Sequence, residues 1–295
     1  PHAAITPGAD MMWKTEGEIL AGLKRETGFA IVAGESLWCF DMWGGFFSTD
    51  AQMKTLARAK SIWSSEAGRA GEVPETALIV DPQSLLQIND QDRRTPLLYR
   101  NLRSELSRTG AAHEVYSFND LGAVDLSAVR LFIFPATFLL TPERRARLER
   151  EVFRPGKTAL FLYAPGISDG QTLDVARVRG LTGTDFGAKG LNWTERNGCR
   201  VAYVADYSSV TMSLLREVQA RAGVHFYADA GLPVATDGRL LSVHVAEGGR
   251  YAVRLPFRAR RVTELWSERV VAEDVEAFDY AFASPDTALF RLEKE

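Results

Sequence analysis

The most constraining feature of the sequence is an alternation of short apolar runs with helical segments between residues 76 and 218. Five runs have the length and β-branched or aromatic content of strands, at 76–80, 114–118, 131–134, 158–163 and 200–205. Helical segments stand among them, and Thr141-Pro142 has the N-cap threonine and first-turn proline of a helix start. Strands that alternate with helices predict parallel pairing, and therefore a flavodoxin-like, doubly wound α/β sheet.

Before this sheet, an aromatic run stands between two predicted helices. The patterns Thr15-x-x-Glu18 and Thr49-x-x-Gln52 are capping boxes at the two helix starts. The run 37–42 is apolar except for Asp41, and it leads into Trp43 and a two-glycine turn. Helix, buried strand, turn and helix are typical of a (β/α)8 barrel, but too little sequence precedes the run to build one. We therefore interpret this part as a remnant of a barrel end.

The last part of the chain has no helical period. Short strand-like runs are separated by turn residues and occur at 224–227, 240–245, 251–255, 261–266 and 288–292. This pattern predicts a small all-β sandwich. The expected domains are 1–72 for the barrel end, 73–231 for the doubly wound sheet and 232–295 for the sandwich, with 64–75 as a linker.

Composition excludes several classes of partner. A formal net charge of −3 and a pI near 5.9 favour neither nucleic acid nor an anionic membrane. No run approaches the ~20 apolar residues of a membrane span, so a cytoplasmic location is the expectation. Cys39 and Cys199 lie far apart in apolar segments, which predicts reduced, buried thiols. The four histidines are dispersed, and we expect no metal and no cofactor.

A doubly wound sheet is also the scaffold of class I glutamine amidotransferases, which need a cysteine nucleophile on a sharp strand-to-helix turn. The turn in the corresponding place begins at Tyr163, and the position for the thiol is held by Ala164 or Pro165. Neither side chain can attack a carbonyl carbon. Cys199 precedes a different strand, and no His-x-Glu pair follows it. The turn is therefore interpreted as a degenerate nucleophile elbow, and an active amidotransferase is the least favoured function.

The aromatic run could form one wall of a sugar site, because aromatic faces suit the C–H side of a pyranose and a carboxylate binds its hydroxyls. Asp41 and Trp43 fall at the end of the predicted strand that faces a ligand in a barrel, whereas a packing role is favoured for Trp38. Glu35 precedes the strand and would lie at the opposite end. One strand cannot supply both carboxylates of a glycosidase. Asp41, Trp43 and Trp38 are substrate-binding candidates, and no catalytic residue is assigned.

At Leu37-Trp38-Cys39-Phe40-Asp41-Met42-Trp43-Gly44-Gly45-Phe46 the chain resembles the closing barrel strand of glycoside hydrolase family 42, the β-galactosidases. The order of the three predicted parts agrees with that family: barrel end, amidotransferase-like trimerisation domain and C-terminal β domain. Further segments resemble the domain junction and the β-domain strands, at 222–227, 241–244, 254–256 and 287–292. The resemblance covers nearly the whole chain, as the C-terminal part of such an enzyme.

The resemblance implies a retaining glycosidase whose two catalytic glutamates stand at the ends of the fourth and seventh barrel strands. The fourth strand is absent from this sequence, and no glutamate occurs in the first 15 residues. The zinc-binding cysteines of the family have no counterpart here. The amidotransferase-like domain is non-catalytic in the family and forms oligomer contacts.

The leading interpretation is therefore the C-terminal part of a β-galactosidase-like hydrolase that is inactive as an isolated chain. Its partners would be a carbohydrate substrate in the full enzyme and further copies in a homo-oligomer, with a trimer among the implied forms. The alternative is a non-enzymatic assembly or carbohydrate-binding module. In either case we expect Leu37, Trp38 and Phe40 to be covered by the rest of a barrel, by another subunit or by rearrangement.

Overall fold

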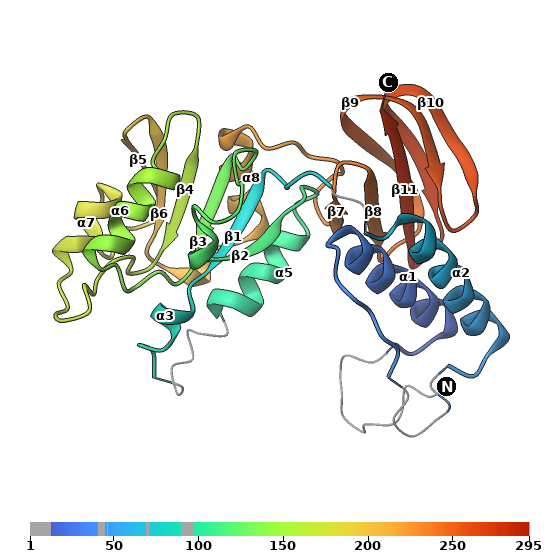
Figure 1. Cartoon of the computed structure of the whole chain (residues 1–295), viewed down its shortest axis with the longest axis horizontal. Coiled ribbons are helices and arrows are strands. Elements are labelled where there is room, and N and C mark those ends of the chain that lie inside the picture. The colour runs from blue at the N-terminus through green and yellow to red at the C-terminus, as the bar shows by residue number, and fades with distance from the viewer. Residues whose placement is uncertain (1–12, 41–44, 46, 69–70, 90–96, 295) are drawn as a thin grey trace. The chain divides into compact units, whose positions relative to one another are not determined.

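The computed structural model describes residues 13–40, 45, 47–68, 71–89 and 97–294. It divides into two compact units (Figure 1). The parallel-sheet unit is Val73–Phe226, and the antiparallel-sheet unit combines Pro1–Glu72 with Tyr227–Glu295. The N-terminal helices thus form one unit with the C-terminal strands, whereas the sequence analysis assigned them to separate domains.

The parallel-sheet unit contains six strands. They are β1 (Thr76–Val80), β2 (Glu114–Ser117), β3 (Leu131–Phe134), β4 (Thr158–Leu162), β5 (Leu191–Arg196) and β6 (Cys199–Val204). Their spatial order is β2-β1-β3-β4-β6-β5, and all neighbours are parallel except β5 and β6. The five predicted strands therefore form the 2-1-3-4-5 order of a doubly wound sheet.

The antiparallel edge strand β5 was not predicted. It pairs with β6 across a two-residue turn in which Asn197 and Gly198 both have positive φ, at 51° and 76°. That geometry is a type I′ hairpin, for which Asn-Gly is the strongest short signal. The signal was present in the sequence, but the largely polar run before it does not resemble a buried strand.

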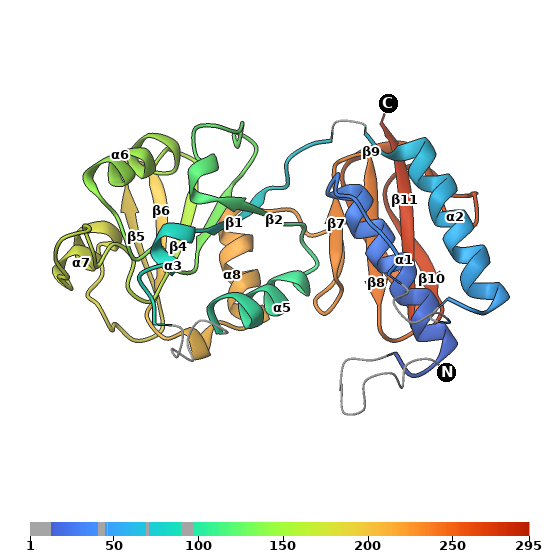
Figure 2. The ribbon, with the colours of Figure 1, turned by 60° about the horizontal axis from the view of Figure 1, so that its bottom comes forward.

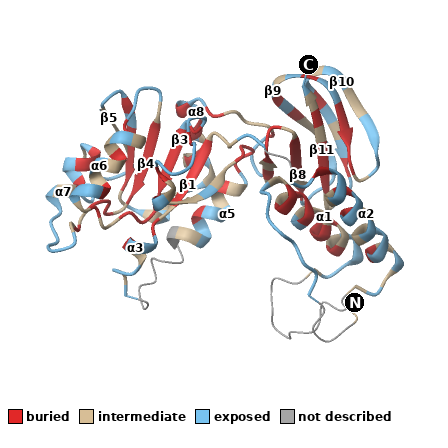
Figure 3. Cartoon of the chain, viewed as in Figure 1, coloured by how far each residue is buried: buried red, intermediate tan, exposed pale blue. Residues whose placement is uncertain are grey.

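Helices cover both faces of this sheet (Figure 3). The elements are α3 (Pro82–Leu85), the π-helix η2 (Leu97–Asn101), α5 (Leu102–Ser107), α6 (Pro142–Glu151), α7 (Ala176–Thr182) and α8 (Met212–Ala222), with short 3-10 turns η3 (Phe118–Asp120) and η4 (Tyr207–Ser209). Leu106 of α5 and Leu215 of α8 pack on the face that carries Leu78. Leu148 of α6 and Val178 of α7 pack on the face that carries Ile79. Thr141 caps α6 as predicted.

The antiparallel-sheet unit contains one five-stranded sheet in its described residues, so the predicted sandwich is wrong. The strands are β7 (Val234–Thr236), β8 (Leu240–Val245), β9 (Gly249–Glu264), β10 (Arg269–Phe282) and β11 (Asp286–Lys294). Their order is β10-β9-β11-β8-β7, and every pair is antiparallel. The predicted runs at 251–255 and 261–266 are two parts of the single strand β9.

The long hairpin of β9 and β10 takes the place of a second sheet. Its register shifts between Val275 and Ala277, opposite a stretch of β9 that includes Pro256, which has no N–H to donate. Beyond this irregularity, the ring of Phe278 in β10 packs edge-on against Phe290 of β11 at 5.2 Å. The hairpin therefore curls over β11 and covers one face of its own sheet. A second register shift lies between Val270 and Ala272, and the two shifts interrupt the two-residue alternation of β10, so this strand was not predicted from the sequence.

Two helices cover the other face of the sheet, α1 (Glu16–Val32) and α2 (Asp50–Glu66) (Figure 2). Ile31 and Ile62 pack there in one cluster with Leu240 and Leu289. The α1 backbone comes so close to β8 at Gly28 that a Cβ would lie 2.6 Å from Ser242 Oγ. Both predicted capping boxes, at Thr15 and Thr49, are present.

The predicted barrel strand at 37–42 is not a strand in its described part, Leu37 to Phe40. A strand needs a neighbour for its backbone hydrogen bonds, and the flanking helices pack on the antiparallel sheet instead. Trp38 is 73% exposed and Phe40 51% exposed, and their rings contact edge-on at 5.0 Å. Cys39 is exposed too, so the expectation of a buried thiol is wrong there, whereas it is confirmed for Cys199.

Candidate functional site

The strand-to-helix turn after β4 contains a strained residue. Tyr163 has a φ of 60°, in the left-handed region that costs a non-glycine residue about 1 kcal/mol or more. Its N–H donates to Val204 O at 2.8 Å, and Tyr203 Oη donates to its carbonyl at 2.5 Å. The left-handed residue of this turn is Tyr163, directly before Ala164 and Pro165, which were named above as the degenerate nucleophile position. Ala164 and Pro165 are both buried directly behind it.

A hollow of about 540 Å³, here called the strand-end pocket, opens beside this turn. Its lining comes from the segments that follow the carboxyl ends of parallel strands: Asn89 after β1, Phe138 after β3, Tyr163 after β4 and Tyr207 after β6. In doubly wound sheets, ligands bind outside this edge. The sequence analysis missed the pocket because its residues stand far apart in the chain, although each follows a correctly predicted strand.

The rings in this pocket form one cluster. Tyr163 contacts Tyr207 at 4.9 Å and Phe138 at 6.0 Å between ring centroids, and it also contacts Phe186 at 5.6 Å. The loop from Ile167 to Asp174 forms a further wall. Arg177 fixes that loop by donating to Thr172 O at 3.0 Å and to the Asp169 carboxylate at 2.6 Å.

Asp81 and Arg144 form a buried ion pair near the same edge. Asp81 is fully buried and accepts hydrogen bonds from Ser84 Oγ at 2.6 Å and from a guanidinium nitrogen of Arg144. That guanidinium also donates to Gln83 Oε1 at 2.8 Å and lies over the Phe118 ring. The carboxylate also caps α3. These contacts occupy its oxygen atoms, and they support a structural role for Asp81.

The buried thiol does not suit nucleophilic catalysis. Cys199 is fully buried at the start of β6, and burial raises the pKa of its thiol to about 12. The thiolate is the nucleophilic form, so this cysteine stays protonated at neutral pH. No group of three or more potential metal ligands occurs in the described part of the chain.

The three substrate-binding candidates have different outcomes. Trp38 lies on the exposed segment that follows α1, beside a shallow hollow of about 360 Å³ lined by Leu37, Cys39 and Trp63 among others. Asp41 and Trp43 lie outside the described residues. The structure thus does not bring these three residues together in a described site.

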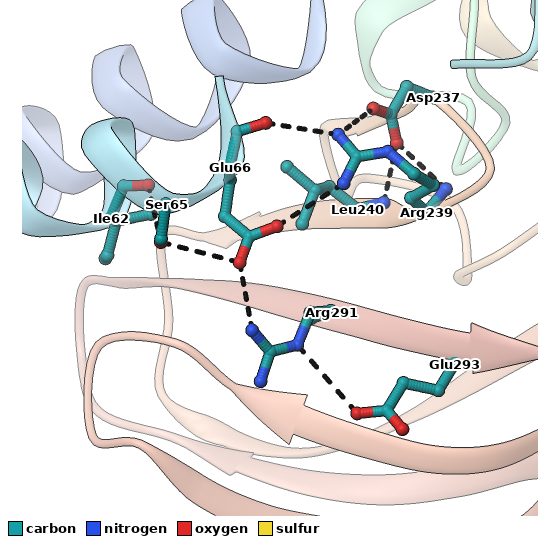
Figure 4. Close-up of polar contacts among 8 residues, drawn as sticks. All are labelled: Ile62, Ser65, Glu66, Asp237, Arg239, Leu240, Arg291 and Glu293. Carbon is teal, nitrogen blue, oxygen red and sulfur yellow. Dashed lines mark hydrogen bonds and ion pairs between the residues drawn. The ribbon is translucent and has the colours of Figure 1, made fainter. Parts of the chain in front are cut away.

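The C-terminal end of α2 is held by a buried charge cluster in the antiparallel-sheet unit (Figure 4). Glu66 is 1% exposed, and its carboxylate pairs with Arg291 at 2.9 Å and Arg239 at 3.3 Å. Arg239 also pairs with Asp237 at 3.1 Å and donates to the Glu66 carbonyl oxygen at 3.3 Å. The cluster connects the last turn of the helix with β11 and the turn before β8, which indicates a structural role.

A partly buried histidine predicts acid sensitivity of the parallel-sheet unit. Burial lowers the pKa of His113 to about 4, and the charge of Arg103 adds to this effect. As the pH falls from about 6.5 to about 4, the unfolded chain binds a proton that the folded ring does not, so stability decreases. We expect this residue alone to remove up to about 3 kcal/mol of unfolding free energy.

Urea unfolding of wild type and His113→Gln at about pH 7.5 and about pH 4.5 measures this effect. The variant should lose less stability on acidification than the wild type. Asn119→Gln, at an exposed position in the same unit, is the control and should behave like the wild type. Equal losses in wild type and His113→Gln would contradict the assignment.

Comparison with known proteins identifies the fold. No protein-family model matches the chain, and no curated protein sequence matches it. Among solved structures, the β-galactosidase from Bacillus circulans sp. alkalophilus matches with a TM-score of 0.63 and 14% identity, over 84% of this chain and 46% of that enzyme. The chain has the fold of the C-terminal portion of a family 42 β-galactosidase.

Two further β-galactosidase structures support the same conclusion. A GH42 β-galactosidase from G. stearothermophilus matches with a TM-score of 0.61 and 13% identity, over 87% of this chain and 47% of that enzyme. The β-galactosidase from Halorubrum lacusprofundi matches with a TM-score of 0.57 and 16% identity, over 83% and 43%. The chain spans a little under half the length of these β-galactosidases, and at such identities the likeness is one of fold.

No helix in the described ranges is long and apolar enough to cross a membrane.

Proposed function

We propose that this chain is the C-terminal, non-catalytic portion of a glycoside hydrolase that cleaves O-glycosidic bonds of β-galactosides. The observation that supports this most strongly is the extent of the fold likeness, which covers 84% of this chain but only 46% of the Bacillus circulans sp. alkalophilus β-galactosidase. In this proposal residues 1–72 are the end of a barrel, and the two catalytic glutamates belong to barrel strands outside the 295 residues.

The exposed segment after α1 is the surface on which the remaining barrel would pack. Leu37, Trp38 and Phe40 are 43%, 73% and 51% exposed, which is unusual for three large apolar side chains so close together. Barrel strands beside this segment would cover them and supply its missing backbone partners. Asp41 and Trp43 would then face the substrate at the end of the restored strand.

The parallel-sheet unit is assigned a structural role as an amidotransferase-like domain. At its elbow a tyrosine occupies the strained position, and the protonated thiol of Cys199 is buried elsewhere. An active amidotransferase is therefore disfavoured. We infer that this unit contributes contacts to a homo-oligomer, and light scattering coupled to size-exclusion chromatography would test that with a mass above 32.6 kDa.

The second candidate is a carbohydrate-binding module without catalytic activity. It is favoured by the strand-end pocket, which combines aromatic rings with uncharged polar side chains. In that case the chain would bind sugars but would not restore hydrolysis to any barrel fragment.

Hydrolysis of a nitrophenyl-galactoside panel would test the leading proposal. The purified chain should show no turnover above buffer. It should restore turnover when combined with the polypeptide encoded directly before Pro1, and Trp38→Ala should weaken that restoration through loss of packing area. The exposed residue Met53 provides a matched control as Met53→Ala. Turnover by the chain alone, or none with the added polypeptide, would contradict the proposal.

A further inference from the structure

We propose that the strand-end pocket of the parallel-sheet unit is a binding site for a neutral saccharide. The pocket lies wholly within this unit, since its lining runs from Gln87 to Tyr207. Its volume of about 540 Å³ is within the range of small-molecule sites. The proposal depends on the proposed function only in the choice of β-galactosides among neutral saccharides.

The lining of the pocket is rich in aromatic rings. Phe138, Tyr163 and Tyr207 contribute rings to the lining, with Tyr163 between the other two. All three are partly exposed rather than enclosed in the core. Partly exposed rings offer a flat apolar surface against which the C–H face of a pyranose can stack. The tyrosine rings also carry a polar hydroxyl group.

The polar side chains among the described lining residues are uncharged. The side-chain amides of Gln87 and Gln171 make no hydrogen bond within the described part of the chain, so their donors and acceptors are available to sugar hydroxyls. The described lining residues include no Asp, Glu, Lys, Arg or His. Among the described lining residues a phosphate or carboxylate would find no counter-charge for its lost hydration, which disfavours anionic ligands.

Backbone contacts hold the pocket in a preformed shape. The strained φ of Tyr163 places its ring among its neighbours, and backbone strain of this kind clusters at ligand sites. Two hydrogen bonds to the Tyr163 backbone hold that conformation, and Arg177 fixes the opposite loop through Thr172 and Asp169. A preformed wall lowers the ordering cost of binding, which matters for a small, weakly binding ligand.

Calorimetric titration of the purified chain with methyl β-galactoside, lactose and cellobiose tests the site, with galacturonate as the anionic comparison. We expect a neutral sugar to bind with a Kd on the order of 1 mM, and galacturonate to bind at least about tenfold more weakly. Tyr207→Ala removes one ring of the pocket. Tyr163→Gly removes another and relieves the strained backbone at position 163, so the Tyr163→Gly variant should fold well. Each should weaken binding at least about tenfold, equivalent to about 1.4 kcal/mol. Gln171→Ala should weaken it less.

Two controls locate the binding. Trp38→Ala removes the exposed indole of the other candidate sugar wall and should leave the Kd unchanged. Tyr251→Ala removes a tyrosine in the antiparallel-sheet unit and should also leave the Kd for the sugar unchanged. Absence of binding, or binding that Trp38→Ala abolishes and Tyr163→Gly leaves intact, would overturn the proposal. If β-galactoside hydrolysis is restored by the added barrel polypeptide while no sugar binds the chain, this site fails and the proposed function stands.

Discussion

Replacing Asp81 with alanine should lower the unfolding free energy of the parallel-sheet unit by about 3–5 kcal/mol. Arg144 is only 8% exposed, and the variant leaves its guanidinium buried without its carboxylate partner. The α3 cap and the Ser84 hydroxyl lose their acceptor at the same time. Hydrogen exchange of β1 and β4 peptides measures the effect in this unit separately from the other.

A double variant separates the charge pair from a general packing effect. Arg144→Met keeps a long apolar side chain over Phe118, and combined with Asp81→Asn it should cost less than the sum of the single changes. Asp120→Ala is the comparison variant, because that partly buried carboxylate accepts from Ser117 N–H and caps only the short turn η3. If Asp81→Ala unfolded no more readily than Asp120→Ala, a structural role for Asp81 would be wrong.

Glu66→Ala should destabilise the antiparallel-sheet unit by about 2–3 kcal/mol. This is less than for Asp81, because Arg239 and Arg291 are 26% and 37% exposed and can recover part of their hydration. The indole of Trp63 lies on α2 and contacts the buried cluster beneath it, so its fluorescence during urea unfolding reports on this helix.

Glu268→Ala is the comparison for Glu66. Its carboxylate also pairs with an arginine, Arg58, but it is 73% exposed, so the expected loss is below about 0.5 kcal/mol. Glu66→Gln keeps the volume and a hydrogen-bond acceptor and should fall between the two. Equal unfolding midpoints for the Glu66 and Glu268 alanine variants would show that burial of this pair contributes little.

The doubly wound sheet could be predicted because its evidence is local. Each of its parallel strands is a short apolar run, and helix starts such as Thr141 have a threonine whose side chain accepts from the third following residue. The strand order then follows from the rules for parallel sheets. The edge strand β5 was not predicted, because an edge strand need not be apolar on both faces.

Whether the aromatic run at 37–42 forms a strand depends on long-range contacts, and a local sequence pattern does not contain them. The same six residues suit a buried barrel strand, but Leu37 to Phe40 has no strand beside it in the described structure. The curled hairpin was not predicted for a related reason. The register shifts at Ala272 and Ala277 change which residues of β10 face inward, so the alternation of apolar and polar residues is broken. Likewise the strand-end pocket combines residues from Gln87 to Tyr207, and no single motif carries it.

The antiparallel-sheet unit is assembled from segments that are synthesised at widely separated times. The hydroxyl of Thr287 donates to the Ala21 carbonyl, and Lys24 pairs with Asp286, so α1 docks on a strand translated more than 250 residues later. During translation the parallel-sheet unit has all its strands before β11 exists, and it can fold while α1 and α2 still lack their sheet. Their apolar faces lack the sheet that covers them throughout that interval, so the core of this unit forms only after β11 has been made.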